Sequence, residues 1–131
     1  MEDWRQLESF SFGDSPALAD ELAALVLAGT KTATCSSVSD GASTHVGRQM
    51  VVLSGSGRPL AVIETVELIQ RRFGEVDAAF AYDEGEGDRS LAYWREAHRR
   101  YFTRLGQFAE DMLLYCERFR VVERIEGADE S

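Results

Sequence analysis

Hydrophobic residues near the start of the chain recur three and four positions apart, which is the spacing of an α-helix with one buried face. Residues 16–28 are therefore predicted to form a helix. Pro16 suits the first turn of such a helix, and Gly29 suits its end. The apolar face of this helix is expected to consist of Leu18, Leu22, Leu25 and Val26.

The segments that follow have the composition of β-strands. Residues 30–37 are rich in β-branched and small side chains, and they are predicted to be a turn that passes into a strand. Residues 50–53 and 60–69 are predicted to pair as a hairpin around a turn rich in Gly and Ser. A last strand is expected over residues 112–122.

Helical spacing returns in the second half of the chain. A short helix is predicted over residues 76–82, and a long helix over residues 90–105. Arg100 and Arg104 are expected to point away from the apolar stripe of the long helix. That stripe consists of Leu91, Trp94, His98, Tyr101, Phe102 and Leu105.

The predicted elements come in the order helix, strands, helices and strand, without a regular alternation of strand and helix. This order favours an α+β fold with a mainly antiparallel sheet, either open or curled into a barrel. A length of 131 residues fits one domain, so a single domain is assigned over residues 1–131. Its core is expected over residues 16–122, and the tail of residues 126–131 is too polar to pack.

The charge of the chain narrows the classes of ligand. It has 23 acidic and 14 basic residues and a net charge of −9. Proteins that hold long nucleic acids usually neutralise phosphates with Lys and Arg. Generic duplex DNA is therefore not expected as a partner, and a small or locally contacted ligand is favoured.

Composition also bears on location. No segment approaches the roughly 18 to 20 uncharged apolar residues of a membrane span, and the first residues lack the features of a secretory signal. A cytoplasmic protein without a membrane partner is expected. Cys35 and Cys116 are then expected to be reduced thiols, and the His and Cys residues form no zinc-site signature along the sequence.

The turn Gly29–Thr34 is the first candidate for chemistry. Lys31 is the only lysine of the chain, and a lysine, unlike an arginine, can lose its proton when it is desolvated. A neutral Lys31 could take the proton of Thr34, which would make that hydroxyl a nucleophile. The alternative is an exposed lysine beside threonines that favour a strand.

Two glutamates stand among apolar residues of predicted strands. Glu64 shares a face with Val62 and Leu68 in a strict alternation, and Lys31 would be an obvious partner if that face is buried. Glu117 has the same position on the last strand. For each, a structural ion pair is as good an interpretation as a catalytic role.

The loop Asp83–Asp88 has four carboxylates and two glycines in six residues. It can present oxygens to a metal ion, to a proton-transfer site or to sugar hydroxyls, although its spacing is not that of an EF-hand. The alternative is a solvated loop in which Asp88 caps the following helix. Tyr82 and Tyr93 are candidates for stacking on a base, whereas His98 is expected to be a hydrogen-bonded core residue.

Several motifs occur together in a fixed order: Gly29-x-Lys31-x-x-Thr34, Gly57-Arg58-Pro59 running into Ala61–Thr65, Glu84–Asp88, Ser90–Arg95, and Cys116–Phe119. This ordered set resembles the ASCH domains, relatives of the PUA barrel, and among them the short stand-alone bacterial members. The resemblance extends from about Pro16 to Val122. It implies a mainly antiparallel PUA-like β-barrel flanked by α-helices.

The resemblance also implies a cleft that faces a nucleoside or a short single-stranded RNA. Two activities are attributed to such domains: amidohydrolysis of 4-acetylcytidine by a Lys/Thr/Glu site, and metal-dependent ribonuclease activity. By match to the motif, Lys31 would be the base and Thr34 the nucleophile. Glu86 is the first choice for the glutamate, ahead of Glu84, and Glu64 would be a supporting partner or a direct participant.

The remaining expectations follow from the same resemblance. The amidohydrolase needs no cofactor, whereas the ribonuclease would hold Mn or Mg through Glu84, Glu86 and Asp88. A non-catalytic module that binds RNA or a nucleotide is the alternative function. Residues expected to contact the substrate are Gly29, Glu84, Asp88, Tyr93 and Arg95.

Overall fold

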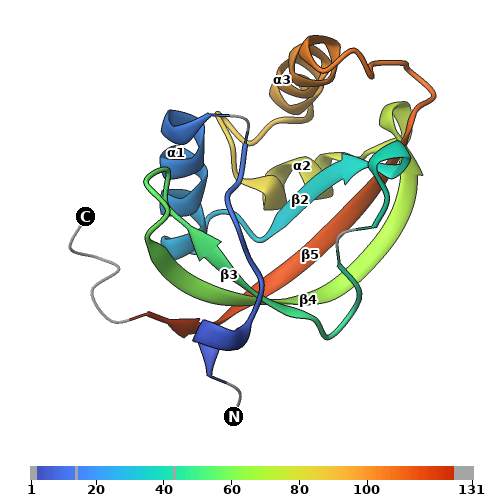
Figure 1. Cartoon of the computed structure of the whole chain (residues 1–131). Helices are drawn as coiled ribbons and strands as arrows, with labels where there is room; N and C mark the ends of the chain where they lie inside the picture. The colour runs from blue at the N-terminus through green and yellow to red at the C-terminus, as the bar shows by residue number, and fades with distance from the viewer. Residues whose placement is uncertain (1–2, 14, 43, 126–131) are drawn as a thin grey trace.

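The computed structural model describes residues 3–13, 15–42 and 44–125 and has an α+β architecture (Figure 1). Its helices are α1 (Pro16–Leu27), α2 (Ala78–Glu84) and α3 (Leu91–Arg104). Its strands are β1 (Ser9–Phe10), β2 (Ala33–Ser37), β3 (Gln49–Leu53), β4 (Pro59–Arg72) and β5 (Leu113–Arg124). Short 3-10 turns occupy Trp4–Gln6, Val38–Asp40 and Phe73–Glu75.

The five strands form one open sheet in the order β1-β3-β4-β5-β2. The β1–β3 pairing is parallel, and the other three pairings are antiparallel. Because the edge strands β1 and β2 do not pair with each other, the sheet is not closed, and the expectation of a barrel is wrong. Closure depends on a pairing between distant strands, and a β1 of two residues offers little backbone for one.

The predicted elements are present with shifted ends. The first helix starts at Pro16, with the Ser15 hydroxyl accepting the N–H of Leu18 as its cap. The return strand of the hairpin continues to Arg72, because β4 pairs with β5 along most of its length. The short helix α2 begins and ends two residues later than predicted. The polar tail of residues 126–131 lies outside the described residues.

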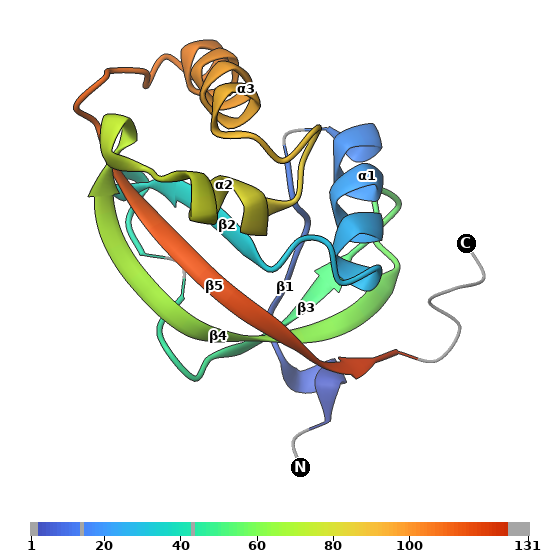
Figure 2. The ribbon, with the colours of Figure 1, turned by 180° about the vertical axis from the view of Figure 1, so that it is seen from behind.

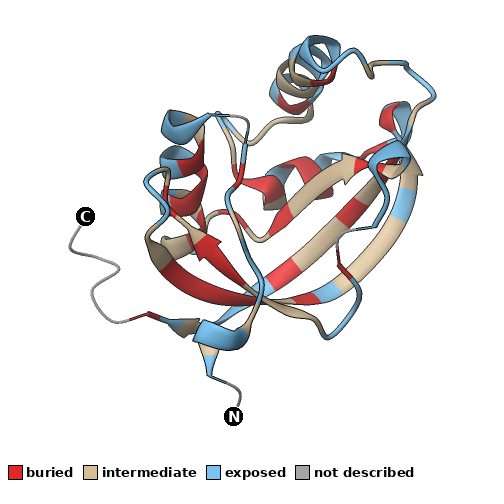
Figure 3. Ribbon diagram, viewed as in Figure 1, coloured by how far each residue is buried: buried red, intermediate tan, exposed pale blue. Residues whose placement is uncertain are grey.

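Helices cover both faces of the β4–β5–β2 region. Alternate residues of a strand point to opposite faces. Leu114 and Cys116 of β5 pack with α2 and α3, whereas Phe119 packs with α1. Figure 2 shows α2 in front of β2 and alongside β5 in the reverse view, with α1 beside them. Figure 3 shows that the buried residues of α1 and α2 lie on the sides turned toward the sheet.

A cluster of buried apolar residues lies between the sheet and the helices α2 and α3. Its residues are Ala33, Phe73, Val76, Phe80, Ala81, Trp94, Phe102, Leu114 and Cys116. Phe73 and Leu114 are both fully buried there. This cluster fixes α2 and α3 against β2, which bears Thr34 and follows the Lys31 turn.

Leu114→Ala should lower the free energy of unfolding by roughly 2 to 5 kcal/mol, because it removes a side chain of 0% exposure and leaves a cavity. Leu113→Ala, at the adjacent position with 39% exposure, is the matched control and should cost less than about 0.5 kcal/mol. Urea denaturation of both variants measures the difference. Equal losses at the two positions would contradict this account of the core.

Candidate functional site

The turn that follows α1 positions Lys31. The N–H groups of Thr30 and Lys31 both donate to the carbonyl of Leu25, at 3.0 and 3.1 Å, so the chain reverses tightly at the helix end. Gly29 has a φ of +80°, in the left-handed region that favours glycine. Gly29 therefore shapes the turn and does not border either cavity described below.

The acidic loop packs directly on this turn. The N–H of Thr32 donates to the carbonyl of Asp83 at 2.8 Å. Gly85 ends α2 with a φ of +76°, and a Cβ at this position would lie 2.5 Å from the carbonyl oxygen of Thr30. Only a glycine allows so close an approach with that backbone. Arg89 adds a hydrogen bond from its guanidinium to the same carbonyl, at 3.3 Å.

The Lys31 ammonium is buried, with 1% exposure, and is surrounded by oxygen. It donates to the carbonyl of Ala33 at 2.8 Å, to Oε1 of Glu84 at 3.1 Å and to Oε2 of Glu86 at 3.2 Å. The side chain of Glu84 is also 1% exposed, whereas that of Glu86 is 21% exposed. Glu86 is therefore the carboxylate of the pair that solvent or a ligand can reach.

Helix α3 supports the far side of Glu84. The indole N–H of Trp94 donates to Oε2 of Glu84 at 2.7 Å, and Nε2 of His98 lies 3.7 Å from Oε1. The rings of Trp94 and His98 stack with centroids 4.3 Å apart. The predicted core histidine is thus hydrogen-bonded to the Trp94 carbonyl through Nδ1, and it also faces the buried carboxylate.

The charges of this group stabilise one another. Burial by itself would lower the pKa of Lys31, but Glu84 and Glu86 raise it above the usual value. Burial would raise the pKa of Glu84, but Lys31 and His98 hold it well below its usual range. Glu84 likewise raises the pKa of His98 against the effect of burial. The resting site therefore contains an ammonium ion, and not the neutral lysine considered from the sequence.

Two adjoining cavities meet at β2. The first, the charged cavity, has a volume of about 410 Å³. Its lining includes Lys31, Glu84, Glu86, His98, Arg100 and Arg104. The second, the aromatic cavity, has a volume of about 230 Å³. Its lining includes Phe10, Met50, Ile63, Thr65, Tyr115 and Glu117. Arg100 and Arg104 are exposed and lie off the buried stripe of α3, as predicted, and both also border the charged cavity.

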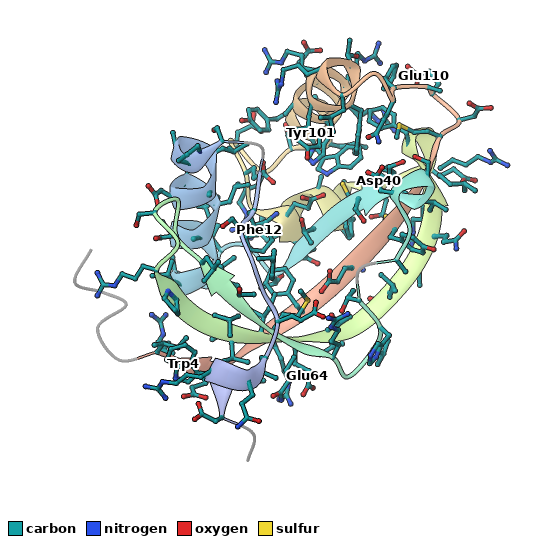
Figure 4. All side chains as sticks on the ribbon, viewed as in Figure 1. Trp4, Phe12, Asp40, Glu64, Tyr101 and Glu110 are labelled. Atoms are coloured by element: carbon teal, nitrogen blue, oxygen red, sulfur yellow. The ribbon has the colours of Figure 1, made fainter. Side chains whose placement is uncertain are left out.

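Thr34 lies where the two cavities join. Both cavities are bordered by Phe12, Gly13, Thr34, Cys35 and Tyr101. In Figure 4, Phe12 lies on the segment between β1 and α1, and Tyr101 projects from the side of α3 nearest to it. No hydrogen bond between Lys31 and Thr34 occurs among the described residues. Lys31 and Thr34 thus share a cavity without a hydrogen bond between their side chains.

Glu117 is the strand glutamate that faces the cavities. It is the register partner of Thr34 across β2 and β5, so the two side chains lie on the same face. Its Oε2 accepts a hydrogen bond from the Thr65 hydroxyl at 2.7 Å. Burial raises the pKa of Glu117, although that hydrogen bond and the charge of Lys31 oppose the shift.

Glu64 points away from the cavities. Its neighbours Ile63 and Thr65 both border the aromatic cavity, so Glu64 between them lies on the opposite face. Its carboxylate accepts hydrogen bonds from Gln49 at 3.1 Å and Arg120 at 3.2 Å, and these hold its pKa below the usual value. Lys31 is therefore not the partner of Glu64.

Of the remaining expected site residues, Tyr93 borders a cavity, whereas Asp88 and Arg95 do not. Tyr93 borders the charged cavity, and its ring packs against Gly87. Asp88 instead accepts the N–H of Ser90 at 2.9 Å, and Ser90 is the residue that caps α3. Arg95 is exposed and borders neither cavity. The other stacking candidate, Tyr82, has the Arg89 guanidinium over its ring at 3.6 Å.

The three expected metal ligands do not converge. Glu84 and Glu86 are directed at the Lys31 ammonium, and Asp88 is directed at a backbone N–H. These contacts leave no common position for a divalent ion. The described residues do bring Cys35, Glu84 and His98 within 4.8 Å of one another, which the sequence spacing could not reveal. There, however, Lys31 already balances the charge of Glu84.

The fold and the site together define a small α+β domain with a ligand cleft beside an edge strand. The model of the ASCH domain matches residues 8–123, and the chain belongs to this family. No protein with a curated description matches it. No helix among the described residues is long and apolar enough to cross a membrane.

Two solved structures are similar along most of the chain. One is an ASCH domain from Lactobacillus crispatus JV V101, with 40% identity, a TM-score of 0.82, and coverage of 88% of this chain and 79% of that one. The other is a protein from Enterococcus faecalis V583, with 35% identity, a TM-score of 0.82, and coverage of 95% of this chain and 81% of that one. Both similarities support the family assignment.

Lys31→Met should destabilise the fold by about 3 to 5 kcal/mol, because it leaves the buried Glu84 carboxylate without its cation. Combining it with Glu84→Gln should recover part of that loss, since the second change removes the unpaired charge. A double-mutant cycle measured by urea denaturation at neutral pH gives the coupling, expected at about 1 to 3 kcal/mol. Strict additivity would refute the pairing.

Glu84 and Glu117 should give opposite pH dependences of stability. The lowered pKa of Glu84 means that its contribution is present above its unfolded-state value, near 4.5, and is lost as the pH falls below it. The raised pKa of Glu117 means that stability is lost as the pH rises above 4.5.

Glu84→Gln should therefore flatten the loss of stability in acid, whereas Glu117→Gln should increase stability at pH 7 relative to pH 4. Denaturation midpoints at several pH values measure both effects. If the two substitutions changed the pH dependence of stability in the same direction, the pairing assigned to Glu84 and the burial assigned to Glu117 would be wrong.

Proposed function

We propose that this ASCH domain is a hydrolase that acts on a modified nucleoside or the end of a short single-stranded RNA. The observation that carries the proposal is a buried lysine, paired with a solvent-accessible glutamate, in a cavity shared with a threonine hydroxyl. These are the groups needed for base, acid and nucleophile in amide hydrolysis.

The resting ammonium is one proton transfer from a basic lysine. Lys31 and Glu86 are hydrogen-bonded at 3.2 Å, so transfer of a proton along this bond gives an amine and a carboxylic acid. A substrate that displaces water from the cavity favours this transfer, because an ion pair loses its solvation while two neutral groups lose less. Glu84 stays ionised beside them and limits the change to one proton.

The reaction then proceeds with balanced protons. The Lys31 amine takes the proton of Thr34 as the Thr34 oxygen attacks the carbonyl carbon of an acylated exocyclic amine. Glu86 gives its proton to the leaving nitrogen, so the ion pair is restored and the acyl group is an ester on Thr34. Water then cleaves that ester to the free acid and regenerates the hydroxyl.

The amide reaction is favoured over phosphodiester cleavage by metal because Glu84, Glu86 and Asp88 are engaged elsewhere. Arg100 and Arg104 border the charged cavity and offer local positive charge to a single phosphate. The net charge of −9 opposes binding of a long nucleic acid. A nucleoside or a short single strand fits both facts.

A binding module without turnover is the second candidate. The observation that favours it is the charged resting state of Lys31, which suits contact with a carbonyl or phosphate oxygen without any proton transfer. In that case, Lys31 and the two arginines would hold the ligand, and Thr34 would act only as a hydrogen-bonding group.

Hydrolysis of 4-acylated cytidines and short single-stranded RNAs, each with and without Mn, separates these functions. Thr34→Val removes the hydroxyl at nearly constant shape and should abolish turnover of an acylated cytidine, by at least about 100-fold, while leaving binding. Glu86→Gln should lower the rate constant by roughly 10² to 10⁴. Liquid chromatography of the released nucleoside measures the rate.

Thr103→Val is the matched control, because it makes the same change at an exposed position of α3 that borders neither cavity. It should retain most of the activity. Turnover that persists in Thr34→Val would exclude this mechanism. If the wild-type protein binds these ligands but hydrolyses none of them, the binding module is the function that remains.

A further inference from the structure

The aromatic cavity contains a carboxyl group that the described protein does not neutralise. Glu117 is half-buried, and its one hydrogen bond is the one that Thr65 donates to Oε2 at 2.7 Å. No described Lys, Arg or His lies within ion-pair distance of it. Its other oxygen, Oε1, has no protein partner among the described residues, and the residue borders an open cavity.

A chain of hydroxyls fixes how Glu117 is oriented. The Thr44 and Thr65 hydroxyl oxygens are 2.7 Å apart, and Thr65 uses its single hydrogen on Glu117. Thr44 is therefore the donor to Thr65. Both threonines are buried, so this short chain holds Oε2 in place from the wall of the cavity. Oε1 is then wholly available to a ligand, and Oε2 keeps a second lone pair that can accept from the same ligand.

The shape of the cavity suits one small planar ring. A volume of about 230 Å³ equals that of about eight water molecules at about 30 Å³ each, which is space for a single ring system and not for a chain of nucleotides. Aromatic side chains at the lining offer faces and edges to such a ring. They are Phe10, Phe12, Tyr101 and Tyr115.

The chemistry of a half-buried carboxyl selects the ligand. An ionised carboxylate without a cation repels anions and loses solvation when the cavity fills. A carboxylic acid, in contrast, donates through one oxygen and accepts through the other, so it matches an N–H next to a ring acceptor. That pair of groups lies on the edge of an uncharged pyrimidine base.

We propose that the aromatic cavity is the base subsite of the cleft, in which Glu117 binds the hydrogen-bonding edge of an uncharged pyrimidine. Glu117 is the register partner of Thr34, and Thr34 borders both cavities. A base held by Glu117 therefore has its exocyclic substituent next to the Thr34 hydroxyl. The ribose or phosphate then extends into the charged cavity, toward Arg100 and Arg104. This inference rests on the proposed function only in taking the ligand to be a nucleoside.

The test is equilibrium binding of cytidine and uridine, with ribose 5-phosphate as a ligand that lacks a base. Glu117→Met removes both hydrogen-bonding groups and should weaken cytidine binding at least about tenfold, with ribose 5-phosphate binding unchanged. Glu64→Gln, which changes a strand glutamate outside the cavities, is the matched control and should bind as the wild type does.

A second variant keeps the test sharp if Glu117→Met is poorly folded. Because burial raises the pKa of Glu117, wild-type affinity for cytidine should fall as the pH rises through that pKa. Glu117→Gln keeps a donor and an acceptor and does not titrate, so it should remove this dependence. The other titratable or charged groups around the cavity are Cys35, Arg48, Tyr101, Tyr115 and Lys31, and they are unchanged in both proteins.

The outcomes distinguish the subsite from the hydrolase. If cytidine binding depends on Glu117 and no substrate is turned over, the subsite stands without the hydrolase. If acylated cytidine is hydrolysed but Glu117→Met changes neither KM nor binding, the subsite is wrong. Wild-type protein that binds neither nucleoside at millimolar concentration overturns the subsite as well.

Discussion

A buried ammonium group must be surrounded by oxygen atoms, and the packing around the cleft provides them for Lys31. Removal of a lysine from water costs several kcal/mol unless its charge is paired and its protons are bound. Glu84, Glu86 and the Ala33 carbonyl provide those oxygens. Because Glu84 is 53 positions away in the sequence, the pair also joins the two halves of the chain.

The same requirement extends outward from the pair. Glu84 is itself buried, so its second oxygen takes the indole N–H of Trp94, and this fixes α3. The loop can reach Lys31 only where Gly85 lets two backbones approach, and Arg89 then binds the turn from outside. The polar contacts around Lys31 thus join the α1 turn, the loop after α2 and α3, beside the apolar cluster that packs α2 and α3 on the sheet.

Local pattern predicted the elements well because each depends on residues close in sequence. The hydrophobic spacing of α1 and α3 is of this kind, and so are the lysine turn and the acidic loop, although Ser90 and not Asp88 caps α3. The predictions that failed depend on contacts between residues far apart in the sequence. Barrel closure needs two edge strands to meet, and a pattern within one strand has no information about that. Glu64 and Glu117 had equal claims, because alternation alone does not say which face of a strand becomes the inside.

The sequence also gives no indication of which side chains from distant segments become neighbours. Cys35 and His98 lie 63 positions apart in the sequence, and only folding brings their side chains next to Glu84. The choice between Glu84 and Glu86 as the accessible carboxylate likewise depends on which one α3 covers. The sequence locates the acidic loop, but the solvent exposure of each carboxylate within that loop is a property of the packed molecule.

The position of β5 has a consequence for synthesis. Although it is the last of the described strands in the sequence, it lies inside the sheet between β4 and β2, and among the described strands it alone pairs with β2. A growing chain that ends before residue 113 therefore exposes one unpaired edge of β4 and both edges of β2. Thr34 has no Glu117 opposite it until β5 has been synthesised and has paired with β2. The aromatic cavity, which Tyr115 and Glu117 border, is thus completed only by the insertion of β5, whereas every residue that lines the charged cavity precedes that strand.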